Sequence, residues 1–152
     1  MEIRTFRDLV DWTRQRHAHL AKCLHDSAEN HRDERASALL DYLARHEQLL
    51  ERTIAEFEKQ ADPKVMDTLL YDYTGHKPIV LSPLPETGYA NLDYDQIERD
   101  IFSFHEQVME LYEDLIANID IPDVNSLLED LKSLEQHEAM LVAQQVGRMD
   151  DI

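Results

Sequence analysis

The stretch LARHEQLL at residues 43–50, together with its echo LEQHEAML at residues 134–141, decides the predicted fold of this chain. Both stretches read Leu-x-x-His-Glu-x-x-Leu. In an α-helix, residues three and seven positions apart share one face, so each stretch predicts an apolar stripe with one histidine, His46 or His137, at its centre. Because the same unit occurs twice, the chain is predicted to contain two copies of one helical hairpin.

The composition is that of an acidic helical protein. The 152 residues are enough for one domain with a buried core. The formal net charge of −17 repels phosphate groups, so we expect neither nucleic acid nor a membrane as a partner. The single cysteine, Cys23, excludes an intrachain disulfide and fits a reducing compartment. With no apolar run of transmembrane length and no apolar region typical of a signal peptide, we expect a cytoplasmic location.

Hydrophobic periodicity predicts four long helices. They cover residues of about 4–29, 32–60, 94–118 and 123–146. Asp93 and Gln96 match a capping box that opens the third of these helices. Short connections join the first helix to the second and the third to the fourth, which makes each pair antiparallel neighbours.

The segment 61–91 separates the two hairpins and holds most of the glycines and prolines. It is too long for a hairpin turn, so we interpret it as a crossover that makes the second and third long helices parallel; a functional lid is the alternative. The predicted fold class is all-α: an antiparallel four-helix bundle of two helical hairpins joined by a long crossover, in a single domain of residues 1–152.

One histidine falls on the predicted inner face of each long helix: His17, His46, His105 and His137. In the fourth helix the predicted inward residues are Val124, Leu127, Leu131, Leu134, His137 and Leu141. The spacing within each hairpin places its two histidines at a similar height, so folding the hairpins together would bring all four imidazoles to one level. Neutral imidazole is the commonest metal ligand, and four of them are a set that binds Fe, Zn, Ni or Cu. The sequence therefore predicts a site for one transition metal ion.

Acidic and phenolic groups accompany these histidines. Glu47, Glu106 and Glu138 each directly follow a histidine, which places them beside the core, where they would orient the imidazoles or serve as alternative ligands. Tyr112 lies on the predicted inner side of the third helix. The alternative that stays open is a buried polar network without metal, in which these glutamates and tyrosines such as Tyr42 or Tyr112 pair with the histidines.

The chain resembles the ferritin-like superfamily, and more particularly its rubrerythrin-like members. The resemblance covers nearly the whole chain in helix order and crossover placement. It is most specific at residues 43–50 and 134–141, which are similar to the helices that carry the Glu-x-x-His di-iron motif of that family. Residues 105–112 resemble its third-helix pattern, in which a ligand glutamate lies seven residues before a tyrosine.

The chain departs from that motif at its carboxylates. Leu43 and Leu134 stand where the family has the glutamates of the motif, and His17 and His105 stand where it has single glutamates. The resemblance therefore implies a degenerate di-iron motif, with a histidine-rich metal site and a redox or metal-handling role. The second class of function is a non-catalytic helical bundle with a relic polar core, which acts by association, as a homodimer. The residues identify no substrate and no reaction.

Overall fold

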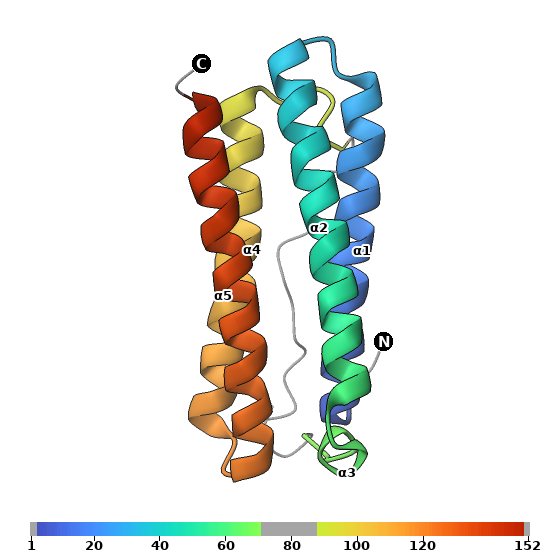
Figure 1. Cartoon of the computed structure of the whole chain (residues 1–152), viewed down its shortest axis with the longest axis vertical. Coiled ribbons are helices and arrows are strands. Elements are labelled where there is room, and N and C mark those ends of the chain that lie inside the picture. Colours follow the sequence, from blue (N-terminus) through green and yellow to red (C-terminus); the bar gives the residue numbers. More distant parts are fainter. Residues whose placement is uncertain (1–2, 71–87, 151–152) are drawn as a thin grey trace.

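The computed structural model describes residues 3–70 and 88–150, and over these residues the chain is all-helical. The described residues contain no β-strand; Thr5 and Leu69 form only an isolated antiparallel bridge. The helices follow one another along the chain (Figure 1) as α1 Phe6–Asn30, α2 Glu34–Gln60, α3 Pro63–Met66, α4 Tyr94–Asn118 and α5 Pro122–Asp150. The prediction of an all-α chain is confirmed, and the four long helices lie close to their predicted bounds.

Capping boxes fix the beginnings of α1 and α4. The Thr5 hydroxyl accepts a hydrogen bond from Asp8 N at 3.1 Å, and the Asp8 carboxylate accepts one from Thr5 N at 3.1 Å. At α4, Asp93 accepts from Gln96 N at 2.8 Å and the Gln96 side chain accepts from Asp93 N at 3.0 Å, as predicted. These bonds satisfy backbone N–H groups that have no partner within the helix, so each helix begins at a defined residue.

The four long helices lie as two antiparallel pairs, α1 with α2 and α4 with α5 (Figure 1). In this view α2 and α4 both run downward, while α1 and α5 both run upward. Helix α2 also contacts α4 and α5, which joins the two pairs. Most of the predicted crossover, residues 71–87, lies outside the described residues. Among the described helices, none is both long and apolar enough to span a membrane.

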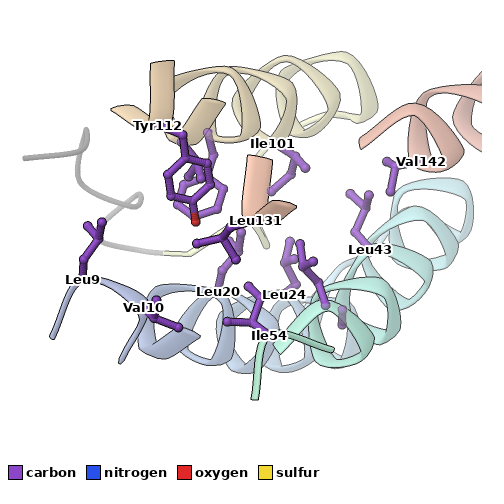
Figure 2. Close-up of a cluster of buried hydrophobic side chains, with 14 of the residues drawn as sticks. Leu9, Val10, Leu20, Leu24, Leu43, Ile54, Ile101, Tyr112, Leu131 and Val142 are labelled. Atoms are coloured by element: carbon purple, nitrogen blue, oxygen red, sulfur yellow. The ribbon is translucent and has the colours of Figure 1, made fainter. Parts of the chain in front are cut away.

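All four long helices contribute apolar side chains to one core cluster. Figure 2 shows part of it, with Leu20 of α1, Leu43 of α2, Ile101 of α4 and Leu131 of α5 around a shared interior. Each of these four side chains is at most 2% exposed. Burying a side chain of this size contributes about 1.5–3 kcal/mol relative to leaving it in water. The cluster therefore fixes which face of each helix points inward, and so where the polar residues on those faces lie.

Helix α5 turns a different face to the core from the one predicted. Its buried residues are Val124, Leu128, Leu131, Glu135, Val142 and Val146. The predicted inward residues Leu127 and Leu134 are only half-buried, and Leu141 is 40% exposed. The predicted stripe was purely apolar apart from its histidine, whereas the actual stripe has the carboxylate of Glu135 near its centre. The prediction for α5 is therefore right for Val124 and Leu131, which are buried, and close to the observed extent of the helix, but wrong for the positions from Leu134 to Leu141, where the inner face is shifted.

Candidate metal centre

A polar cluster built from all four long helices interrupts the apolar core. His17 of α1 donates from Nδ1 to Glu47 Oε2 of α2 at 2.5 Å and from Nε2 to Glu135 Oε1 of α5 at 2.8 Å. His105 of α4 donates from Nε2 to Glu47 Oε1 at 2.5 Å. The Tyr112 hydroxyl of α4 donates to Glu135 Oε1 at 3.2 Å. We call these five residues, none more than 6% exposed, the central cluster.

Helical spacing explains why the two carboxylates are buried. Glu47 lies four residues after Leu43 and three before Leu50, so all three share the inner face of α2. Glu135 lies four residues after Leu131 and seven before Val142 on the inner face of α5. The apolar neighbours hold each glutamate inside, where it is stable only with hydrogen-bond partners. The histidines and Tyr112 supply those partners.

The proton positions in the central cluster follow from its geometry. Both ring nitrogens of His17 face carboxylate oxygens, which act as acceptors, so both nitrogens carry a hydrogen and the ring is an imidazolium. Burial alone would lower the pKa of His17, but the charges of Glu135 and Glu47 outweigh burial and raise this pKa to about 10. Burial would likewise raise the pKa of Glu47, but His105 and His17 hold it far below its ordinary value. Burial, and then Glu135, raises the pKa of Tyr112, which stays a hydroxyl donor.

A second polar pair lies beside the central cluster, between α2 and α5. His46 Nε2 and Glu138 Oε2 are 3.2 Å apart, yet both atoms are buried without a hydrogen-bond partner among the described residues. Burial lowers the pKa of His46 and outweighs the opposing effects of Glu138 and Glu47, so its ring is neutral at neutral pH. The ring of Tyr42 packs against that of His46 with centroids 6.1 Å apart. We call His46 and Glu138 the outer pair.

The four predicted histidines do not all converge. The ring centroids of His17 and His105 lie 6.4 Å apart. The charge of Glu47 raises the pKa of His46 and that of His105 lowers it, so His46 lies near both residues. His137, in contrast, is exposed, so the prediction that it faces the core is wrong. It points outward because α5 is rotated relative to the predicted phase, so that Glu135 lies on the inner face two residues earlier.

The glutamates are distributed differently from the prediction as well. Glu47 lies in the central cluster and Glu138 in the outer pair. Glu106 is exposed and cannot orient a buried imidazole. The sequence interpretation missed Glu135. Its signal was present in the spacing of Leu128, Leu131 and Glu135, which share one helical face, but a glutamate on that face was not considered.

The two groups contain imidazole nitrogens and carboxylate oxygens, and in the structure these atoms face one another. Over the described residues, no group of three or more His, Cys, Asp or Glu side chains is arranged to hold a metal ion. In the central cluster, both nitrogens of His17 are taken up by hydrogen bonds to carboxylates. Three of the buried side-chain atoms without a hydrogen-bond partner among the described residues belong to these two groups: Nδ1 of His105 and the two facing atoms of the outer pair. Imidazole nitrogen with carboxylate oxygen is a combination that binds iron and zinc.

Comparison with known families, with curated proteins and with solved structures finds no match to this chain. The ferritin-like resemblance therefore remains a prediction from the sequence motifs. The buried histidines and glutamates, with the contacts described above, are the features of this chain that bear on its function.

Proposed function

We propose that this chain is a metal-binding protein of ferritin-like four-helix-bundle architecture. It binds one first-row transition metal ion through the outer pair together with Glu47 and His105. The observation that carries the proposal is the outer pair itself: His46 Nε2 and Glu138 Oε2 face each other at 3.2 Å, buried and without hydrogen bonds among the described residues. Leaving such atoms unpaired costs roughly 1–3 kcal/mol for each group, and a cation between them removes that cost.

The charge balance of the site supports a cation. Three carboxyl groups, those of Glu47, Glu135 and Glu138, lie in or beside the core, where His17 is held as an imidazolium. Buried charges are tolerated when they are paired or when they coordinate a metal. A divalent ion beside Glu47 and Glu138 would offset the remaining negative charge more completely than the imidazole of His46, whose pKa burial lowers, does.

The rest of the central cluster would hold the ligands in place. His17 donates to one oxygen of Glu47 and His105 to the other, so the carboxylate of Glu47 has a fixed orientation; Glu135 and Tyr112 in turn hold the ring of His17 in place through Glu135. Hydrogen bonds of this kind orient ligand side chains and tune metal affinity. The bound metal would supply Lewis acidity if it is zinc, or one-electron redox chemistry if it is iron or copper. The side chains of the protein would position the ion.

One observation favours a second candidate function. In the central cluster, both nitrogens of His17 and both oxygens of Glu47 already have partners. A satisfied network of this kind can specify how helices pair without any metal. The chain would then be a non-catalytic bundle that acts by association, as a homodimer.

Metal content separates the two candidates. Protein purified without a histidine tag and loaded with Co²⁺ or Zn²⁺ should retain about one ion per chain after desalting, measured by elemental analysis. His46→Gln and Glu47→Gln should each lower that content. His137→Gln is the matched control, because His137 is exposed on α5, and it should retain the wild-type content. Wild-type protein that holds no more metal than His46→Gln would refute the proposed function and leave the structural bundle.

A further inference from the structure

The surface that α2 and α5 share, at the front of the bundle in Figure 1, bears apolar side chains that the core does not bury. Leu49 of α2 is 51% exposed and Leu141 of α5 is 40% exposed. Tyr42 of α2 and Leu134 of α5 are half-buried. In each helix the two residues are seven apart, so they lie along one side of it. We call this surface the α2–α5 face.

The outer pair fixes the register of the four side chains. Its two facing atoms are 3.2 Å apart, and α2 and α5 run in opposite directions (Figure 1). Tyr42 and Leu49 lie four residues before and three after the histidine of the outer pair, and Leu134 and Leu141 lie four before and three after its glutamate. Tyr42 is therefore at the height of Leu141, and Leu49 is at the height of Leu134. The face thus carries two apolar pairs, one helical turn on either side of the outer pair.

Exposed charges of both signs accompany these apolar pairs. Arg45 and Glu56 lie four residues before and seven after Leu49, on the same side of α2. Asp130 and His137 lie four residues before and three after the half-buried leucine of α5. The chain as a whole has a net charge of −17, which repels a second copy over most of the surface. On the α2–α5 face, in contrast, the charges of one copy can be matched by those of another.

The match has two-fold symmetry. The midpoint of Arg45 and Glu56 falls between residues 50 and 51 of α2, and the midpoint of Asp130 and His137 falls between residues 133 and 134 of α5. The register of the outer pair places residue 50 at the height of residue 134, so the two midpoints coincide in height. A second copy turned by 180° about an axis across the helices at that height would bring Arg45 opposite the Glu56 of the second copy. It would likewise bring Asp130, an acceptor, opposite the imidazole N–H of the other His137, and each contact would form twice.

Within one chain the charges on α2 have local partners that do not prevent this pairing. Arg45 Nη2 lies 2.7 Å from Asp41 Oδ2, and Lys59 Nζ lies 3.3 Å from Glu56 Oε1. Exposed ion pairs along one helix contribute little to stability, so they can give way to contacts across an interface.

We propose that a second copy of this chain packs on the α2–α5 face to form a two-fold symmetric dimer about this axis. The inference goes beyond the proposed metal function and does not depend on it; it gives the second candidate function a surface and a symmetry. The two helices have 27 and 29 residues, so each is about 40 Å long, and side by side they are about 20 Å wide. The resulting area, about 800 Å², is what each partner contributes to a specific interface of standard size.

Sedimentation equilibrium in EDTA tests the apolar centre of the face. The mass of the wild type should rise with concentration from 17.8 kDa toward twice that value. Leu49→Glu places a charge beside the axis and should raise the dissociation constant of the dimer at least roughly tenfold. Leu69→Glu is the matched control, because Leu69 is 67% exposed but lies beside Thr5, before α1; it should match the wild type. Circular dichroism verifies folding, which an exposed glutamate on α2 should leave unchanged.

A charge exchange tests the symmetry. Arg45→Glu would place like charges opposite each other twice and should weaken the dimer by roughly tenfold. Adding Glu56→Arg to the same chain should restore the wild-type dissociation constant, since each contact again joins opposite charges. Arg99→Glu is the control for the single substitution: Arg99 is exposed on α4, outside the face, and the change should have no effect on the mass.

Three results would overturn the proposal. A wild type that stays at 17.8 kDa up to a concentration of about 100 µM would exclude a second copy as the occupant of the face, while metal content would still decide the proposed function separately. A dimer that Leu49→Glu leaves intact would exclude the α2–α5 face as the contact. A dimer that the exchange of Arg45 and Glu56 does not restore would exclude the two-fold axis across the helices.

Discussion

Replacing His17 by glutamine should remove most of the pH dependence that the central cluster gives to the stability of the metal-free protein. His17 is fully buried; burial lowers its pKa, but Glu135 and Glu47 outweigh burial and raise it from 6.5 to about 10. At 1.36 kcal/mol for each pKa unit, the imidazolium with its two carboxylates contributes at most roughly 5 kcal/mol to folding.

The sign follows from the pKa values of the folded and unfolded chain. The pKa of His17 is higher in the folded state, so its contribution is fully present below about pH 6.5 and is lost as the pH rises toward about 10. Glu47 acts in the opposite direction: its folded-state pKa lies below 4.5, so its contribution is present above pH 4.5 and is lost on acidification. From about pH 6.5 to about pH 9 the contribution of His17 should fall by up to roughly 3 kcal/mol.

Urea unfolding in the presence of EDTA, followed by circular dichroism at about pH 6 and about pH 9, measures this loss. The matched control is His19→Gln, because His19 lies on the same helix but is exposed. Wild type and His19→Gln should lose a similar free energy of unfolding between the two pH values, and His17→Gln should lose much less. A wild-type decline no steeper than that of His17→Gln would refute the imidazolium between two carboxylates.

Two further predictions concern the fold. Gly88 has a φ of +69°, and a Cβ added there would lie 2.9 Å from the Ser27 hydroxyl, so Gly88→Ala should cost about 1–3 kcal/mol. Gly147→Ala is its control: a Cβ at this helical position meets nothing within 4 Å, and alanine should stabilise by about 0.5–1 kcal/mol in chemical unfolding. For α5, Leu128→Ala should cost about 2–5 kcal/mol in thermal unfolding, while Leu141→Ala should cost under about 0.5 kcal/mol. Equal costs for these two leucines would restore the helical phase predicted from the sequence.

The helices were predictable because their signals are local. The side chains of Asp93 and Gln96 satisfy each other's backbone N–H groups, so the beginning of α4 depends on only four consecutive residues. In α1 and α2 the apolar stripe is continuous enough that His17 and His46 were placed on buried positions without tertiary information.

The phase of α5 was not predictable from apolar spacing alone. Leu127, Leu134 and Leu141 form a regular apolar series, and so do Leu128, Leu131 and Val142 around Glu135. Choosing between them requires knowing that His17 and Tyr112 are present to receive the carboxylate of Glu135. Those partners are distant in the sequence, so a stripe that contained a glutamate was not considered, and His137 was assigned to the core.

The metal claim is tested most directly by the thermal midpoint of protein verified to carry metal, measured before and after prolonged treatment with a strong chelator. We predict that removal of the ion lowers the midpoint by roughly 5–10 °C and that adding back Zn²⁺ or Co²⁺ restores it, because an ion that binds only the folded chain stabilises it by about 2–4 kcal/mol. Glu138→Gln should show a smaller response, since it removes one donor of the outer pair. An unchanged midpoint in protein that had carried metal would contradict a stabilising metal site at His46, Glu47, His105 and Glu138.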